Sequence, residues 1–367
     1  MSRWPQKKLF EIAQVMMGQS PPGETYNARG EGLPFFQGKA EFGDVYPTPG
    51  KWCSEPLKIA EPGDILLSVR APVGPTNIVH VKSCIGRGLA AIRANQGLIL
   101  PSLLLYFFKA YEQSIAQLGV GSTFNAIGKD DIGNLEIPVP PLSHQEQIVG
   151  ILNESDHLRR LRAETDRRTA ELIPALFHEM FGDPKSNPLA WPIREFGELG
   201  SNEDGKRVPV RESDRELRKG SYPYYGASGI IDWIDEYLFD GTALLVAEDG
   251  ANLLARSTPI AFLATGKFWV NNHAHVITDN GEADLIYLCE FLNQIELKDF
   301  VTGSAQPKLN QANLNCIGVP TPPLALQRLF AARIAEIRTM EDEQASSRQH
   351  LNDLFQSLLH RAFQGEL

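Results

Sequence analysis

Cysteines and long apolar runs are scarce in this chain of 367 residues. Its four cysteines stand singly, without the CxxC or Cys/His spacing of a zinc site, and are expected to be buried thiols: Cys53, Cys84, Cys289 and Cys316. The most apolar stretch, residues 98–108, contains Pro101, and at about 11 residues it is shorter than the roughly 20 that a membrane span needs. Neither a signal peptide nor a membrane helix is expected, and the reducing cytoplasm is the expected location.

Motifs that carry chemistry are also missing. The sequence has no GxxxxGK[ST] phosphate loop, no HExxH zinc motif and no Asn/Asp-Pro-Pro-Tyr/Phe methyltransferase motif. Glu296-Leu-Lys298 has the Glu-x-Lys form of some nucleases, but its surroundings have a helical pattern. We therefore expect no catalytic residue, no metal site and no cofactor.

An excess of basic charge is absent too, which by itself argues against a nucleic-acid partner. The chain has 35 Lys and Arg against 45 Asp and Glu, a net charge of −10. The acidity is concentrated in residues 186–322, where 11 basic side chains face 19 acidic ones, whereas residues 1–141 have 13 and 12. A DNA-binding surface would have to be a local cluster of basic side chains.

What the chain does have is an internal repeat. A proline-rich segment, Pro138-Val-Pro-Pro-Leu142, returns 182 residues later as Pro320-Thr-Pro-Pro-Leu324. Two copies of such a unit account for nearly the whole chain. Further matches include Gln145 with Gln327, Gly121-Ser122 with Gly303-Ser304, and, with a gap, Pro34-Phe-Phe-Gln-Gly38 with Pro223-Tyr-Tyr-Gly226.

Each copy has two parts. The first parts, residues 1–141 and 186–322, have short apolar runs bounded by turn residues, as in strands, and one helix each, near Leu103–Leu118 and Leu285–Phe300. The second parts, 142–185 and 323–367, have apolar residues 3, 4 and 7 apart, which predicts helices of about 38 residues, roughly 57 Å long.

The predicted fold class is α+β. Two pseudo-symmetric mixed α/β domains are separated by two long antiparallel helices that form a coiled-coil spacer. Packing of each helix on its own domain is the alternative, and in general it deserves about even odds. The length of the helices, and their place at the end of each copy, favour packing against each other.

The ordered set of a Gly-Ser segment, Pro-x-Pro-Pro-Leu-x-x-Gln and a long helix, all duplicated, resembles the specificity subunits of Type I restriction-modification systems. Residues 63–74 and 84–92 also resemble segments of that family's target recognition domains. The resemblance implies that residues 1–141 and 186–322 are two target recognition domains. Each would read one part of a split site in double-stranded DNA, and the helices would set the spacing between the parts.

The resemblance also implies partners: two methyltransferase (modification) subunits bound through the helical regions, and restriction (endonuclease/translocase) subunits recruited on top. The chain itself would be a non-catalytic DNA-recognition subunit. A duplicated scaffold that binds protein and makes no DNA contact is the alternative function, and the net charge of −10 favours it.

Two arginines of the first domain are candidates for DNA contact. Arg70 lies in a Pro/Gly loop after an apolar strand, where a guanidinium can reach a guanine edge or a phosphate, and Arg87 lies between two glycines. An exposed loop arginine without a ligand is the alternative for both. The counterpart of the Arg70 loop, Ala247-Glu-Asp-Gly-Ala251, differs, as expected if the two domains read different half-sites.

Further candidates lie in a small polar segment and in one basic run. The polar segment suits phosphate or base contact, although a simple turn is equally typical of it: Ser122, Thr123, Asn125 and Lys129, with the counterparts Ser304, Gln306 and Lys308. Arg207 and Arg211 belong to the only basic run of the acidic block, where interleaved acids make a solvated face as good an interpretation. Asn271, Asn272, His273 and His275 have side chains that could read adenine, but histidines at alternating positions of a strand are more often structural.

Overall fold

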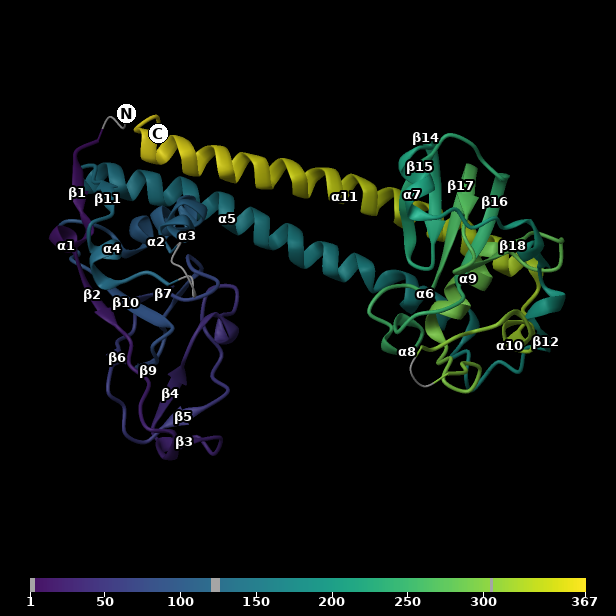
Figure 1. Ribbon diagram of the computed structural model, residues 1–367, viewed down its shortest axis with the longest axis horizontal. Coiled ribbons are helices and arrows are strands. Elements are labelled where there is room, and N and C mark those ends of the chain that lie inside the picture. Colours follow the sequence, from purple (N-terminus) through teal and green to yellow (C-terminus); the bar gives the residue numbers. More distant parts are fainter. Residues whose placement is uncertain (1–3, 120–125, 304–305) are drawn as a thin grey trace. The chain divides into compact units, whose positions relative to one another are not determined.

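The computed structural model of the chain describes residues 4–119, 126–303 and 306–367. It divides into two compact units, which are coloured along the sequence in Figure 1. Unit 1 comprises Met1–Ala163 and Ser346–Leu367, and unit 2 comprises Glu164–Ala345. Each unit therefore contains one α/β domain together with helical segments from both copies of the repeat.

Unit 1 contains two sheets and a short strand pair. The strand orders are β2-β10-β7-β8 and β3-β5-β4-β9-β6, and β1 pairs with β11. The strands are β1 (Gln6–Lys8), β2 (Ala13–Met17), β3 (Tyr26–Asn27), β4 (Leu33–Phe36), β5 (Trp52–Cys53), β6 (Ile59–Ala60), β7 (Ile65–Ser68), β8 (Thr76–Ile78), β9 (Ser83–Ile85), β10 (Leu89–Ala94) and β11 (Glu136–Pro138). The helices of this domain are α1 (Leu9–Ile12), α2 (Pro101–Ala110), α3 (Glu112–Leu118) and α4 (Lys129–Gly133), with 3-10 turns η1 (Gly23–Thr25) and η2 (Lys39–Glu41).

Unit 2 contains one six-stranded sheet of order β13-β18-β16-β17-β14-β15 and the pair β12-β19. The strands are β12 (Ile193–Glu195), β13 (Ser201–Asn202), β14 (Lys219–Gly226), β15 (Gly229–Ile234), β16 (Phe239–Ala247), β17 (Ala261–Val270), β18 (Ala274–Thr278) and β19 (Gly318–Pro320). The helices of this domain are α7 (Glu212–Glu216), α8 (Asn252–Ala255), α9 (Leu285–Gln294) and α10 (Gln311–Asn315), with 3-10 turns η3 (Phe196–Glu198) and η4 (Asp204–Lys206).

Strand β7 is buried along its whole length, and three of its four residues are apolar, because both of its faces pack against other elements. In β7, Ile65 and Leu67 pack into the cluster that contains helix α2, whereas Leu66 packs with Phe36 and Ile85 of the second sheet. Side chains of a strand alternate between its faces, so each face of β7 contributes to a different core. The end of such a strand is fixed from both sides, and a loop that follows it has a defined starting point.

The helix expected at Leu285–Phe300 is shorter than predicted. Helix α9 ends at Gln294, and residues 295–300 form bends and turns. The guanidinium of Arg256 donates to the carbonyl oxygens of Leu292 and Ile295, which gives the last carbonyls of α9 a partner outside the helix. Glu296-Leu-Lys298 therefore lies beyond the helix in which its sequence pattern placed it.

The long helices are α5 (Leu142–Ala170), α6 (Leu172–Phe181) and α11 (Leu324–Gln364). The first copy is therefore broken at Glu171, where the sequence predicted one continuous helix. Pro174 explains the break, because it has no N–H for the carbonyl of Ala170 and its ring collides with that carbonyl in a regular helix. The second copy has no proline between Leu324 and Gln364 and runs unbroken for 41 residues.

Each α/β domain packs against the beginning of the long helix of its own copy. It also packs against the end of the helical region of the other copy. The core of unit 1 contains Ile148 and Leu152 of α5 together with Phe355, Leu359 and Phe363 of α11. The core of unit 2 contains Phe330 and Ile334 of α11 together with Phe177 and Phe181 of α6. Packing of a helix on its own domain, the alternative left open by the sequence, therefore does occur for the first turns of α5 and α11.

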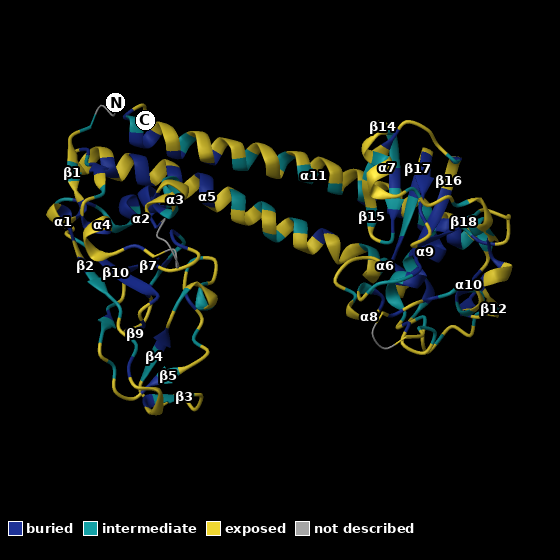
Figure 2. Cartoon of the chain, viewed as in Figure 1, coloured by how far each residue is buried: buried dark blue, intermediate teal, exposed yellow. Residues whose placement is uncertain are grey.

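The helices also contact each other directly. In unit 1 the guanidinium of Arg159 (α5) donates to Asn352 Oδ1 (2.8 Å) and lies 4.4 Å from the ring centre of Phe355 (α11). In unit 2 Arg333 (α11) lies 3.9 Å from the sulfur of Met180 (α6). Residue numbers rise along one helix as they fall along the other, so the helices pack antiparallel. Their middle parts, residues 164–170 and 341–348, are mostly exposed or half-buried (Figure 2).

The repeated glutamine of the proline-rich motif has a structural explanation. Gln145 is fully buried: its Oε1 accepts from the N–H of Leu100 (2.8 Å), and its Nε2 donates to the carbonyls of Leu98 (2.9 Å) and Pro140 (2.8 Å). Gln327 is also fully buried and donates to the carbonyl of Pro322 (2.8 Å). In both copies the glutamine ties the proline segment to the backbone of another part of the domain.

We expect Gln145→Ala to lower the free energy of unfolding of unit 1 by about 2–4 kcal/mol, because it leaves a buried N–H and two carbonyls without their partner. Urea unfolding of the full chain, followed through unit 1, measures this. The matched control is Gln147→Ala, two residues away and exposed, which should stay within about 0.5 kcal/mol of the parent. Equal effects of the two substitutions would contradict the structural role of Gln145.

Three of the four cysteines are buried, as expected, but Cys316 is exposed, which corrects the expectation for that residue. Burial raises the pKa of the Cys84 thiol to about 11 and that of Cys289 to about 12, so both are protonated near neutral pH. A protonated thiol is a weak nucleophile. Among the described residues, no helix has the length and hydropathy needed to cross a membrane.

Candidate nucleic-acid interface

A loop that follows strand β7 presents Arg70. Val69 is still buried in the core, and Arg70 is the first exposed residue after the strand. The Ser68 hydroxyl lies 3.1 Å from the carbonyl oxygen of Arg70 and 2.7 Å from that of Pro72, and the backbone of Arg70 forms an antiparallel bridge with Ala126. The backbone at Arg70 is thus held on two sides while its side chain is exposed.

The segment that carries Arg87 is hydrogen-bonded to the Arg70 loop. The N–H of Val69 donates to the carbonyl of Gly88 (2.9 Å), which places the two arginines on neighbouring stretches of backbone. Gly88 has to be a glycine, because a Cβ there would lie 2.3 Å from the carbonyl oxygen of Gln37. The close approach brings the end of β4 beside Arg87.

Arg70 and Arg87 line one hollow of about 210 Å³, together with Gln37 and Lys39. We call this the unit 1 hollow. Within the described parts of the chain, the guanidinium groups of Arg70 and Arg87 and the ammonium of Lys39 have no hydrogen-bonding or ion-pair partner. Three unpaired cations around one hollow form the local basic cluster that the overall charge of −10 conceals.

Gln37 and Lys39 were not among the candidates from the sequence. A signal for them does exist, since Pro34-Phe-Phe-Gln-Gly38 resembles Pro223-Tyr-Tyr-Gly226. Both segments form the strand that pairs in parallel with its neighbour, β4 with β9 in unit 1 and β14 with β17 in unit 2. This repeat therefore marks a strand whose end lies beside the Arg70 loop.

Unit 2 has the same backbone arrangement with different side chains. The N–H of Glu248 donates to the carbonyl of His273 (2.9 Å), as Val69 does to Gly88, and Asp249 bridges Lys308 as Arg70 bridges Ala126. Asp249 thus occupies the position of Arg70.

Two of the predicted DNA contacts, Arg207 and Lys308, bind the same carboxylate inside unit 2. Arg207 Nη1 lies 2.7 Å from Glu248 Oε2, and Lys308 Nζ lies 3.1 Å from Glu248 Oε1. The Arg207 side chain is only 13% exposed and also reaches Asp204 (3.3 Å), whereas the Lys308 side chain is 52% exposed. The structure therefore brings these two residues together, but it gives the Arg207 guanidinium partners within the protein.

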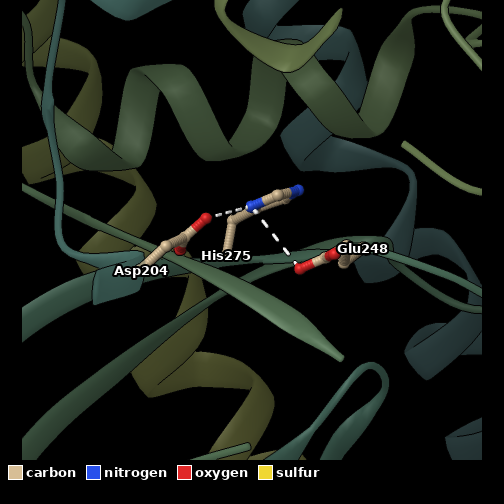
Figure 3. Close-up of side chains that lie close together, drawn as sticks. All are labelled: Asp204, Glu248 and His275. Carbon is tan, nitrogen blue, oxygen red and sulfur yellow. Dashed lines mark hydrogen bonds and ion pairs between the residues drawn. The ribbon is translucent and has the colours of Figure 1, made fainter. Parts of the chain in front are cut away.

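His275 completes this buried network (Figure 3). Its Nδ1 lies 2.6 Å from Asp204 Oδ2 and 3.9 Å from Glu248 Oε2, and its Nε2 lies 2.8 Å from the carbonyl oxygen of Leu309. Both ring nitrogens face oxygen atoms of the protein, so both are engaged within unit 2. The ring links η4, the end of β16 and the segment around Leu309.

Asp204, Glu248 and His275 have a donor set that suits a metal ion, with ligand atoms within 4.8 Å of one another. Their surroundings do not fit one. Arg207 and Lys308 already neutralise the carboxylates, and both nitrogens of His275 are used. The arrangement is that of an internal ion-pair network, which holds the Asp249 loop in place.

The network makes the stability of unit 2 depend on pH. Burial raises the pKa values of Asp204 and Glu248, but hydrogen bonds and charges from His275, Arg207 and, for Glu248, Lys308 outweigh it, so both pKa values lie below their usual range. A carboxyl with a depressed pKa in the folded state stabilises the protein above its unfolded-state pKa, and this contribution is lost as the pH falls through the folded pKa. We therefore expect unit 2 to lose stability below about pH 4.5.

Asp204→Asn tests this expectation. The variant should be less stable than the parent at pH 7. The difference should shrink as the pH falls from about 4, the usual pKa of an aspartate, toward about 2, because the unfolded parent takes up a proton before the folded parent does. The urea midpoint of unit 2 at each pH is the measurement. Asp240→Asn, at an exposed carboxyl, is the control and should follow the parent. A constant difference between Asp204→Asn and the parent across this range would show that the charge of Asp204 does not stabilise the fold.

The remaining candidates are dispersed. Lys129 begins α4 and its Nζ lies 5.9 Å from the ring centre of Phe10. Helix α10 begins at Gln311, which is therefore the counterpart of Lys129, whereas Lys308 corresponds to Ala126. The two lysines that the repeat suggested as a pair are thus not equivalent.

Two other predicted contacts, Arg211 and Gln306, are exposed. Four further candidates lie outside the described residues: Ser122, Thr123, Asn125 and Ser304.

Comparison with known proteins identifies the family. Residues 1–169 and 188–342 match the family described as "Type I restriction modification DNA specificity domain". The chain belongs to this family. The sequence resemblance to Type I specificity subunits is thereby confirmed, and so is the α+β fold with two α/β domains and long helices packed together.

Individual members of the specificity family match different shares of the chain. The putative type I restriction enzyme MjaX specificity subunit of Methanocaldococcus jannaschii is 46% identical over 156 residues, which are 42% of this chain and 36% of that protein. The match thus spans little more than a third of that relative. The type I restriction enzyme MjaIX specificity subunit of the same organism is 24% identical over 375 residues, with 89% of this chain and 85% of that protein covered.

A solved structure shows the same fold over nearly the full length. The type I restriction-modification S subunit from M. genitalium superimposes with a TM-score of 0.61 over 99% of this chain and 96% of that one, at 16% identity. At this identity the likeness concerns the fold alone.

Proposed function

We propose that this chain is the DNA specificity subunit of a type I restriction-modification complex and that each of its two units reads one half of a bipartite site in double-stranded DNA. The chain recognises DNA and does no chemistry itself. Membership of the specificity family supports this proposal, and so does the recurrence of one backbone arrangement in both units.

The observation that carries the proposal is the unit 1 hollow. Arg70, Arg87 and Lys39 surround it without protein partners among the described residues, although the chain as a whole is acidic. A guanidinium donates two parallel hydrogen bonds to N7 and O6 of guanine, and it also binds phosphate oxygens. Because the backbone under Arg70 is fixed by Ser68 and Ala126, this side chain starts from a defined position, as base reading requires.

The partners belong to the proposal as well. Two methyltransferase subunits would bind through the helical regions of α5, α6 and α11, and restriction subunits would join that complex. The antiparallel helices would set the spacing of the two half-sites. Equivalent surfaces of a pseudo-symmetric protein meet equivalent DNA surfaces about one helical turn apart, roughly 34 Å, or a multiple of it.

The competing function is a scaffold that binds proteins only, which the acidic residues 186–322 favour. Salt dependence separates the two, because phosphate contacts release counterions and the affinity then falls with salt. Arg70 is assigned to base reading, so the phosphate contacts of the unit 1 hollow are those of Arg87 and Lys39. If these two cations contact phosphates, raising the salt from 50 to 200 mM should weaken duplex binding by about 12-fold from these contacts alone.

The matched variant replaces Arg87 and Lys39 by alanine and should flatten that salt dependence by about two ions. Arg29→Ala is the control, since Arg29 is exposed and paired with Glu31 (3.1 Å). Fluorescence anisotropy of a labelled duplex library measures both. An affinity for duplex DNA that does not change with salt concentration, or no binding to duplex DNA by the full chain, would favour the scaffold.

A further inference from the structure

The backbone hydrogen bonds define which residues of the two units are equivalent. The N–H of Gly86 donates to the carbonyl of Phe36 (2.8 Å), and the N–H of Asn271 donates to that of Tyr225 (3.0 Å). Together with the bond to Gly88 in unit 1 and to His273 in unit 2, this fixes the residue in between. Arg87 therefore corresponds to Asn272.

The second equivalence is anchored in the same way. Ile127 N–H donates to the carbonyl of Val69 (3.0 Å), and Leu309 N–H donates to that of Glu248 (2.8 Å). The bridges of Arg70 with Ala126 and of Asp249 with Lys308 lie directly beside these bonds. Arg70 therefore corresponds to Asp249, and a side chain that only donates hydrogen bonds is replaced by one that only accepts them.

Asp249 is accessible and has one oxygen to spare. Its side chain is 17% exposed, and its Oδ2 accepts from Nδ1 of His273 (2.7 Å), whose side chain is 47% exposed. Among the described residues, the other carboxylate oxygen has no hydrogen-bond donor, and the exposed amide of Asn272 has no side-chain partner either. The neighbouring Glu248, in contrast, is neutralised by Arg207 and Lys308.

The carboxylate of Asp249 is informative because DNA phosphates repel it. It therefore cannot contribute to affinity that is independent of the DNA sequence. In the major groove it has one favourable partner, the exocyclic amino group of a base, which is N4 of cytosine or N6 of adenine. Guanine and thymine present acceptors there and no donor. An asparagine amide, such as that of Asn272, pairs with N6 and N7 of adenine.

We propose that the two units read base edges of opposite hydrogen-bond character at equivalent positions. In unit 1, Arg70 binds guanine. In unit 2, Asp249 binds a base with a major-groove amino group, adenine or cytosine, and Asn272 lies next to this contact. This inference rests on the proposed DNA-reading function. It assigns one acidic side chain of the second domain, Asp249, to base recognition.

Selection from randomised duplexes by the full chain tests the inference. The parent should enrich adenine or cytosine at one position of one half-site, and Asp249→Ala should relax that preference by about 5- to 20-fold while the other half-site stays unchanged. Asn272→Ala, at an exposed side chain, should relax a neighbouring position. Asp240→Ala removes an exposed carboxylate at the other end of β16 and should leave both half-sites as they are.

Two further arms separate base reading from a structural role. If Asp249 serves only to orient His273, then His273→Ala should reproduce the Asp249→Ala result, whereas base reading predicts that the preference survives in His273→Ala. A selected site in which the base at this position lacks its major-groove amino group (2-aminopurine for adenine, 2-pyrimidinone for cytosine) should bind the parent about 5- to 20-fold more weakly. The Asp249→Ala variant should bind the selected site and the modified site equally well.

Results that contradict the role of Asp249 differ from results that contradict the proposed DNA-reading function. Enrichment of guanine or thymine at the position that depends on Asp249 would overturn the inference. So would a uniform loss of affinity for all sequences in Asp249→Ala, or equal effects of Asp249→Ala and His273→Ala. A parent chain that enriches no sequence at all would instead contradict the DNA-reading function itself.

Discussion

Inserting seven residues into each long helix, near Thr165 in α5 and near Ser347 in α11, should lengthen the preferred spacer between the half-sites by about three base pairs. Seven helical residues add about 10 Å. At about 3.4 Å per base pair this equals three pairs. Seven residues are also about two turns, so the apolar stripe of each helix stays on the same face.

The insertion points lie in the middle parts of the helices, where most residues are exposed or half-buried. The cores formed by Phe355 and Phe363 in unit 1, and by Phe177 and Phe330 in unit 2, lie outside them. Both half-site sequences should therefore stay the same. Insertion into α11 alone is the control, since it shifts one antiparallel helix against the other and should lower the stability of the chain. An unchanged spacer in the double insertion, with normal unfolding, would show that the helices do not position the units.

Replacing Arg70 by alanine should relax discrimination at one position of one half-site by about 1–3 kcal/mol, which is about 5- to 150-fold. A bidentate contact to guanine distinguishes this base from the other three, and its loss removes that distinction. Because each unit meets only its own half-site, the preference of unit 2 should not change. Arg70→Lys keeps the charge but not the paired geometry, and it should lose most of the discrimination while keeping the affinity for unrelated DNA.

Lys129→Ala is the contrast for this experiment. Lys129 is exposed at the start of α4, and as a phosphate contact it should weaken binding to all sequences alike. Competition binding with single-base variants of the selected site measures both effects. If Arg70→Ala altered both half-sites, or neither, the assignment of this loop to base reading would be wrong.

The duplication and the long helices were predictable because repeated residues such as Gln145 and Gln327 serve the same contacts in both copies. The break at Glu171 was visible in principle, since Pro174 disrupts the bond to Ala170. The packing of Phe363 into the core of unit 1 was not predictable. The ring of Phe363 contacts those of Phe107 and Tyr111, which are distant in the sequence, and no local pattern encodes such a contact.

The candidate site was predictable in part. The Arg70 loop follows from an apolar strand that ends in a Pro/Gly segment, and Arg87 from its flanking glycines. The offset between the copies, however, changes along the chain, from 179 residues at Arg70 and Asp249 to 182 at Lys129 and Gln311. The wrong lysines were paired because each follows a repeated Gly-Ser segment, although the offset of 182 places Gln311, and not Lys308, opposite Lys129. At Arg70 the hydrogen-bond register shows that Asp249 is the counterpart.

Arg207 illustrates a second limit. From the sequence it belongs to a basic run. Its partner Asp204 is only three residues away, but its partner Glu248 is distant in the chain and reaches Arg207 through the pairing of β16 with β18 and the placement of η4. The counterparts of Glu248 and His275 in unit 1 are Val69 and Ala90, so the repeat gave no sign of a buried ion-pair network.

Selection of bound sequences from fully randomised duplexes by the full chain shows whether one chain reads two separate half-sites. We expect two short enriched sequences separated by a constant number of unselected base pairs. Arg70→Ala should affect one of them and Asp249→Ala the other. A single continuous motif, or the absence of any enriched sequence, would contradict the reading of two half-sites by one chain.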